Sequence, residues 1–166
     1  MKVDFPNKHF LINGEWVCSN TEIDLINPST GDVIAQVSEA NNEHVNDAVG
    51  VAKDTLENTW KDITARERST LLSKLGRLIE ENYDVLASLE ATDVGKPLRQ
   101  AQADVKALAR YMEFYAGAAD KLHGDTIPYL EDYTVYTLRE PHGVCAHIIP
   151  WNYPMQIIGR SVGAAL

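Results

Sequence analysis

The residues best suited to chemistry surround Asn152, in the order Pro150-Trp151-Asn152-Tyr153-Pro154. Two prolines around three residues restrict the backbone and predict a rigid turn. The turn follows a short apolar run, residues 144–149, and precedes a helix-compatible run that begins at Pro154. In open α/β sheets, ligands bind where strands end and turn into helices. The side-chain amide of Asn152 could therefore donate to a developing oxyanion, an interaction worth roughly 2.7–4 kcal/mol in known enzymes.

Two other interpretations of this region stay open at this point. The same pattern fits a purely structural turn that buries Trp151. Cys145 lies close to the turn in sequence, but we expect it in a buried strand, where a low dielectric raises the pKa of a thiol and makes it inert. Cys18, beside a predicted hairpin, is the weaker candidate of the two cysteines.

The sequence gives weaker support for a phosphate-binding loop, a metal site or a pair of catalytic carboxylates. Residues 93–97 (DVGKP) contain a Gly-Lys pair but not a phosphate-binding loop, because Glu90 stands where that loop needs glycine and Pro97 where it needs serine or threonine. A helix end at Gly95 explains this segment better. The five histidines show no paired metal spacing. The acidic residues are expected on solvated helix faces, and no pair of carboxylates stands out.

The elements that must position the turn begin with two β-hairpins. Residues 9–17 and 23–37 alternate apolar and polar positions, and Asn13-Gly14 and residues 28–31 supply turns. Strands are also predicted at residues 133–139, rich in β-branched and aromatic types, and at 144–149, as a buried strand of a parallel sheet.

Helical periodicity dominates between these strands. A helix capped by Asn41 or Asn42 is predicted, followed by one with a capping box of Thr64 and Glu67. A short helix from 82 to 92 should close at Gly95, and a long one should span about 98–121. The apolar faces expected on these helices are Val45, Ala48, Val49, Ala52 and Leu56; Leu71, Leu72, Leu75, Leu78 and Ile79; and Val105, Leu108, Met112 and Tyr115.

Composition sets the class of protein. The chain has 166 residues, 45% of them hydrophobic and 23% charged, which is typical of a globular domain. A net charge of -9 argues against nucleic-acid binding. No segment approaches the roughly 20 apolar residues of a membrane span, and the N-terminus lacks the apolar core of a signal peptide. Two cysteines without a CxxC pair complete the expectation of a cytoplasmic protein.

The last residues raise the expectation of an incomplete domain. Residues 155–166 (MQIIGRSVGAAL) are apolar and reach the end of the chain without a helix stop signal. The predicted strand at 144–149 would also need neighbouring strands, and none is predicted after it. We therefore expect a fragment of a larger fold.

Residues 148–154 (IIPWNYP) resemble the strand-to-helix signature of the NAD(P)-dependent aldehyde dehydrogenase superfamily. Four further segments agree with that family in order and spacing, so that the resemblance covers essentially the whole chain. These segments are INGEWV at 12–17, INPSTGDVI at 26–34, DVGKP at 93–97 and REPHGV at 139–144.

The resemblance implies an α/β fold: an incomplete Rossmann-like cofactor-binding domain with N-terminal β-hairpins, several helices and a bridging strand. The implied segments are 1–128 for the N-terminal part of this domain, 129–141 for an oligomerisation strand, and 142–166 for the first strand-turn-helix of the dinucleotide-binding core.

The resemblance also implies roles for single residues. Asn152 would donate to the oxyanion that forms when a cysteine attacks the aldehyde, and would border the cofactor. The implied contacts with NAD or NADP are Ile148, Ile149, Pro150, Trp151 and Asn152. Those implied to face the aldehyde substrate are Tyr153, Gln156 and Ile157. Ile26, through its carbonyl, and Asp93 would bind a monovalent cation.

The implied activity is the oxidation of an aldehyde to a carboxylic acid by an intact protein that forms a homodimer or homotetramer. The family's catalytic cysteine and glutamate lie downstream of the signature and are not in this chain, so we expect the 166 residues alone to be inactive and to bind NAD weakly. The alternative is a truncated, non-catalytic paralogue or a helical interaction module.

Overall fold

Two β-hairpins open the part of the chain that the structure, a computed structural model, describes, namely residues 9–166. Both are antiparallel, as predicted, and the Asn13-Gly14 turn of the first has positive φ at both residues. The first eight residues of the predicted 1–128 segment lie outside the described residues. The hairpin strands are β1 (Phe10–Ile12), β2 (Glu15–Val17), β3 (Glu22–Ile26) and β4 (Val33–Ser38).

Helices make up most of the remaining structure, and local capping sets where they begin. The Asn41 side chain accepts from the backbone N–H of His44, and Thr64 and Glu67 form the predicted reciprocal capping box. None of the helices in residues 9–166 is long and apolar enough to cross a membrane. The helices are α1 (Asn42–Asn58), the 3-10 helix η1 (Trp60–Asp62), α2 (Ala65–Glu81), α3 (Tyr83–Val94), α4 (Leu98–Ala118) and α5 (Pro154–Ala165).

The end of α3 confirms the predicted helix stop at Gly95. This residue adopts a left-handed conformation, with φ 73°, and its N–H donates to the carbonyl of Ala91. A Cβ at this position would lie 2.6 Å from Cγ of Pro28, in the turn between β3 and β4. Glycine is therefore required here both by the backbone angle and by the close approach of the hairpin.

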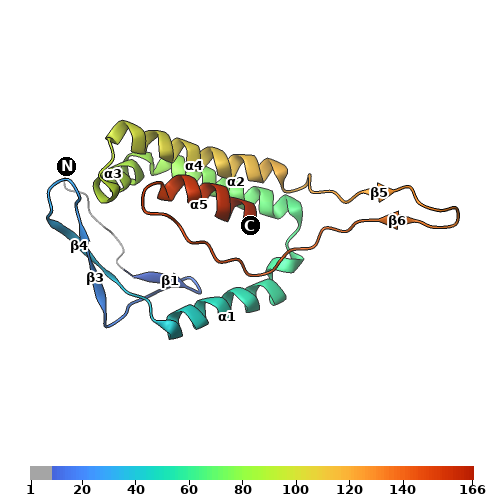
Figure 1. The fold of residues 1–166 in the computed structure, drawn as a ribbon, viewed down its shortest axis with the longest axis horizontal. Helices are drawn as coiled ribbons and strands as arrows, with labels where there is room; N and C mark the ends of the chain where they lie inside the picture. Colours follow the sequence, from blue (N-terminus) through green and yellow to red (C-terminus); the bar gives the residue numbers. More distant parts are fainter. Residues whose placement is uncertain (1–8) are drawn as a thin grey trace.

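The core lies around α4, which packs against α2, α3 and α5 (Figure 1). The predicted face of α4 is confirmed, because Val105, Leu108 and Met112 are buried. The apolar face predicted for α2 is confirmed only in part. Leu72 and Ile79 are buried in the core beside α4. Leu71, Leu75 and Leu78 are exposed, because only one side of α2 packs against other helices. Helix α1 lies apart from the bundle and contributes no fully buried residue (Figure 1).

Gly159 allows α5 to approach Tyr111 of α4 closely, and we predict that a larger residue there destabilises the fold. A Cβ at Gly159 would lie 2.7 Å from Cδ2 and 3.1 Å from Cβ of Tyr111. The second contact lies next to the backbone, so rotating the ring cannot relieve it. We expect Gly159→Ala to lower the free energy of unfolding by about 1–3 kcal/mol, as overpacking does.

Gly50 offers a matched control for this measurement. It is exposed on α1, and a Cβ there would meet nothing within 4 Å. Gly50→Ala should stabilise the helix by roughly 0.5–1 kcal/mol, because alanine loses less backbone entropy than glycine. Denaturant unfolding of both variants tests the contrast, and a stabilising Gly159→Ala would contradict the close packing.

Two strand predictions near the C-terminus need correction. The strand predicted at 133–139 is limited to β6 (Val135–Tyr136), which pairs with β5 (Thr126–Ile127) in a hairpin that extends away from the helices (Figure 1). The buried parallel strand predicted at 144–149 is wrong, because these residues form no strand and most are exposed. A strand needs a hydrogen-bonding partner, and no described strand pairs with this segment.

Candidate functional site

The Asn152 turn leads directly into α5. Pro154 occupies the first turn of the helix, where its missing N–H leaves no hydrogen bond unmade. The side chain of Asn152 is exposed, and none of the hydrogen bonds among residues 9–166 uses its carboxamide. Trp151 is 82% exposed, which contradicts the alternative of a structural turn built on a buried tryptophan. The carboxamide of Asn152 is therefore free to bind another molecule.

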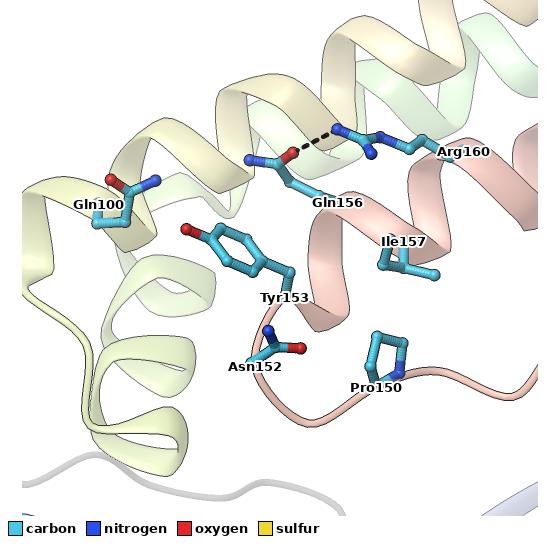
Figure 2. Close-up of a pocket in the computed structure, with 7 residues that line it drawn as sticks. All are labelled: Gln100, Pro150, Asn152, Tyr153, Gln156, Ile157 and Arg160. Carbon is cyan, nitrogen blue, oxygen red and sulfur yellow. Dashed lines mark hydrogen bonds between the residues drawn. The ribbon is translucent and has the colours of Figure 1, made fainter.

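A cavity of about 410 Å³ lies beside this turn. Figure 2 shows its lining side chains, which come from the turn, from one face of α5 and from α4. No acidic side chain is among them, although the chain as a whole has a net charge of -9. The lining residues are Gln100, Pro150, Asn152, Tyr153, Gln156, Ile157 and Arg160.

Behind the cavity lies a buried ionic cluster of Glu90, Lys96 and Asp104. The Lys96 Nζ donates to Oε1 of Glu90 at 2.6 Å and to Oδ2 of Asp104 at 2.8 Å. The three side chains are 1%, 9% and 0% exposed, respectively. Oε2 of Glu90 is buried without a hydrogen-bond partner among residues 9–166. One ammonium group thus neutralises only one of two buried carboxylates.

The pKa values of the cluster follow from this arrangement. Burial raises the pKa of Glu90, and the hydrogen bond from Lys96 offsets this only in part. Burial acts in the same direction on Asp104, but its hydrogen bonds from Lys96 and Gln156 outweigh it and lower the pKa of that carboxyl. For Lys96, burial would lower the pKa, yet the hydrogen bonds to Asp104 and Glu90 prevail and raise it. Asp104 is therefore the carboxylate held in its charged form.

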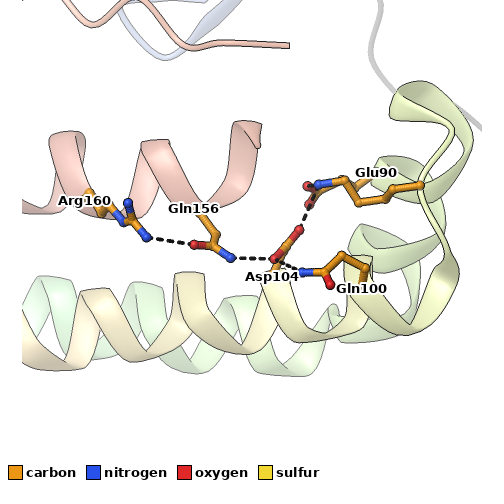
Figure 3. Close-up of polar contacts among 6 residues, drawn as sticks. Glu90, Gln100, Asp104, Gln156 and Arg160 are labelled. Carbon is orange, nitrogen blue, oxygen red and sulfur yellow. Dashed lines mark hydrogen bonds and ion pairs between the residues drawn. The ribbon is translucent and has the colours of Figure 1, made fainter. Parts of the chain in front are cut away.

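Asp104 and Lys96 connect this cluster to the cavity. Nε2 of Gln156 donates to Oδ1 of Asp104 at 2.6 Å, and Gln100 donates to the same oxygen at 3.3 Å (Figure 3). The Lys96 Nζ also lies 4.3 Å from the centre of the Tyr153 ring, within the range of a cation–π interaction. The buried charges of Lys96 and Asp104 thus position two side chains of the cavity, Tyr153 and Gln156.

Comparison with known proteins places this turn and its supporting helices in a family. A sequence model of the aldehyde dehydrogenase family matches residues 16–166. The chain belongs to the aldehyde dehydrogenase family. It is 42% identical over 168 residues to aldehyde dehydrogenase family 2 member B4, mitochondrial, of Arabidopsis thaliana, covering 99% of this chain and 31% of that protein. The chain thus spans about a third of the length of the curated relatives it matches.

Solved structures of aldehyde dehydrogenases have the same fold. A putative aldehyde dehydrogenase from Burkholderia cenocepacia matches with a TM-score of 0.91 and 50% identity, over 95% of this chain and 34% of that one. The NAD+ complex of the Bacillus cereus aldehyde dehydrogenase matches with a TM-score of 0.92 and 41% identity, over 96% and 33%. The predicted fold class, part of a Rossmann-like aldehyde dehydrogenase domain, is confirmed.

The candidate substrate residues Tyr153, Gln156 and Ile157 line the cavity together with Asn152. Of the candidate cofactor residues, Pro150 lines it as well, whereas Ile148 and Trp151 are exposed outside it and Ile149 is half-buried. The prediction that Cys145 is buried is wrong: it is exposed, because its segment forms no strand, and it does not line the cavity.

The candidate cation residues occupy exposed positions. Ile26 ends β3, and Asp93 lies in the last turn of α3, whose capping Gly95 contacts Pro28. Within residues 9–166, no group of three or more His, Cys, Asp or Glu side chains could hold a metal ion. The structure therefore brings the two segments close, while the cation role stays a prediction.

Sequence reasoning missed Arg160 and the buried cluster. The expectation that acidic residues lie on solvated faces is wrong for Glu90 and Asp104, which are both buried. A signal for Asp104 was available, because it immediately precedes Val105 and follows Ala101 by three residues on the apolar face of α4. For Glu90 no comparable signal identified its partner, since Lys96 reaches it across the α3–α4 turn.

Proposed function

We propose that the full-length protein oxidises an aldehyde to a carboxylic acid and that Asn152 stabilises the intermediate. A cysteine outside this chain attacks the aldehyde carbon and forms a C–S bond, the carbonyl oxygen becomes an oxyanion, and the side-chain amide N–H of Asn152 donates to it. After the carbon has lost its hydride to the oxidised cofactor, water attacks the resulting thioester, breaks the C–S bond and releases the carboxylic acid. The observation that carries this proposal is the exposed Asn152 carboxamide, without a hydrogen bond among residues 9–166, beside a cavity without acidic groups.

NAD or NADP is the proposed cofactor. The residues present fit a dinucleotide, because Ile148 and Trp151 are 96% and 82% exposed and form an apolar surface that a bound ligand would cover. Ile149 and Pro150 provide backbone groups beside them. The bound cofactor supplies the hydride acceptor, while the turn between Pro150 and Pro154 keeps Asn152 in place.

The proposed substrate surface consists of Tyr153, Gln156 and Ile157. They lie on one side of the turn and the first turns of α5, facing the same cavity as Asn152. Such a surface combines an aromatic ring, an amide and an aliphatic side chain, which is suited to enclosing an aldehyde. Ile26 and Asp93 are proposed as ligands of a monovalent cation that would join β3 to α3.

A direct test measures NADH or NADPH formation by the full-length protein with a set of aldehydes. We expect production that depends on both the aldehyde and the oxidised cofactor, with the carboxylic acid as product. The 166-residue chain assayed in parallel should give none, because the catalytic cysteine and glutamate lie outside it. A full-length protein that binds no dinucleotide and oxidises no aldehyde would contradict the proposal.

Residues 129–141, which contain β6 of the β5–β6 hairpin, are proposed as the surface through which copies of the full-length protein form a homodimer or homotetramer. The hairpin extends away from the helices (Figure 1), and it carries several large exposed apolar side chains. Such a surface favours association. These side chains are Ile127, Tyr129, Leu130, Tyr133, Tyr136 and Leu138.

A further inference from the structure

Arg160 lines the cavity from the same helix face as Gln156, and Asn152 lines the same cavity from the turn before α5. Gln156 and Arg160 are four residues apart on α5, so their side chains are neighbours on one face of the helix, and Asn152 lies in the turn that precedes the helix. Because side chains on a helix point back toward its N-terminus, the guanidinium of Arg160 lies closer to the turn than its backbone does.

Hydrogen bonds with neutral groups hold this guanidinium in place. Its Nε donates to the Tyr111 hydroxyl at 2.8 Å and its Nη2 to Oε1 of Gln156 at 3.0 Å. The orientation of Gln156 is set in turn by Asp104, because a carboxylate only accepts hydrogen bonds and must face the amide nitrogen. The amide oxygen is thereby directed at Arg160 (Figure 3).

The charge of Arg160 has no acidic partner among residues 9–166. Within that part of the chain, Arg160 takes part in no ion pair and its Nη1 makes no hydrogen bond. Asp104, the acidic group reached through Gln156, is already paired with Lys96. A fixed cation with a free donor in a cavity without carboxylates is suited to bind an anionic group of a ligand.

We propose that Arg160 makes the enzyme selective for aldehydes that carry a carboxylate at the end remote from the reacting carbonyl. The carbonyl lies at Asn152, and the carboxylate accepts from Nη1 of Arg160. This inference rests on the proposed function, since it names the class of aldehyde that the same cavity takes.

The test compares matched pairs of aldehydes with the full-length protein: 4-carboxybenzaldehyde against 4-formylbenzamide, and succinic semialdehyde against pentanal. We expect kcat/KM to favour the carboxylate of a pair by about tenfold or more, as expected for a hydrogen bond with a charged group. Arg160→Met should lower kcat/KM for the carboxylates by about 10–100-fold with little change for the neutral partners, and Arg160→Lys should retain part of the preference.

Arg110 provides the control, because it is exposed on α4, paired with Glu113, and outside the cavity lining. Arg110→Met should leave the preference unchanged. Calorimetric titration with terephthalate, the product of the first aldehyde, adds a readout that needs no turnover, and Arg160→Met should weaken its binding. Two results would overturn the role of Arg160 alone. One is oxidation of the neutral aldehydes with no preference for the carboxylates. The other is an equal fall of kcat/KM for both members of a pair in Arg160→Met. Oxidation of none of these four by a protein that oxidises other aldehydes would also overturn this inference alone, whereas a protein that binds no dinucleotide and oxidises no aldehyde would overturn the proposed function with it.

Discussion

Replacing Asn152 with alanine is expected to lower kcat of the full-length protein about 10²–10³-fold, the loss found when one oxyanion donor is removed. The carboxamide contacts the oxygen most strongly when it becomes charged, so kcat and kcat/KM should fall together while KM changes little. The thermal midpoint should stay the same, because the Asn152 side chain is exposed and makes no hydrogen bond among residues 9–166.

Asn58→Ala is a matched control for this measurement. Asn58 is also an exposed asparagine, but it lies at the end of α1, where its side chain donates to the carbonyl of Asp54 at 2.9 Å. Its replacement should leave kcat unchanged. An unchanged kcat in Asn152→Ala, or a carboxamide tied to another protein group in a crystal of the full-length protein, would remove the assigned role.

Replacing Lys96 with methionine should destabilise the protein by about 3–5 kcal/mol, as expected when one partner of a buried ion pair is lost. The variant leaves Glu90 and Asp104 buried together without a cation, and Oε2 of Glu90 already lacks a partner in residues 9–166. It also removes the ammonium group from the Tyr153 ring. Denaturant unfolding measures the total loss in the free energy of unfolding. Hydrogen exchange of the backbone amides of α3 and α4 shows whether the loss is local to these helices.

Lys53→Met serves as the control for the loss of a lysine. Lys53 pairs with Glu57 on the surface of α1 at 4.0 Å, with both side chains more than half exposed. Such pairs contribute about 0–1 kcal/mol. Adding Glu90→Gln and Asp104→Asn to Lys96→Met should recover most of the lost stability, since no buried charge then remains. A Lys96→Met variant as stable as Lys53→Met would show that the cluster does not stabilise the fold.

The pH dependence of the Lys96→Met variant follows from the same charges. Without the ammonium group, burial and mutual repulsion raise the folded-state pKa of both Glu90 and Asp104 above their unfolded-state values. At pH values between the unfolded-state and the folded-state pKa, the folded state binds more protons than the unfolded state, so the stability of the variant increases as pH falls. The difference from the unsubstituted protein should therefore narrow toward acidic pH, and a constant difference would contradict the assignment.

Features that depend on a few neighbouring residues could be predicted from the sequence. The Asn13-Gly14 turn, the Thr64 and Glu67 capping box and the helix end at Gly95 all formed as expected. Each is determined by backbone preferences and by hydrogen bonds over three or four residues, which are properties of the sequence itself. The proline-bounded turn at Asn152 and its placement before a helix were predicted for the same reason.

Features that depend on distant partners were decided only by the tertiary structure. Residues 144–149 have the composition of a buried strand, yet they form none, because a strand requires another strand beside it. Asp104 has the same residue type as the solvated acids of the chain, but the packing of α4 against α3 and α5 buries it beside Lys96. Arg160 enters the cavity because Gly159 brings α5 close to Tyr111. Burial, strand pairing and convergence on one cavity involve residues far apart in the chain, and local preferences carry no information about them.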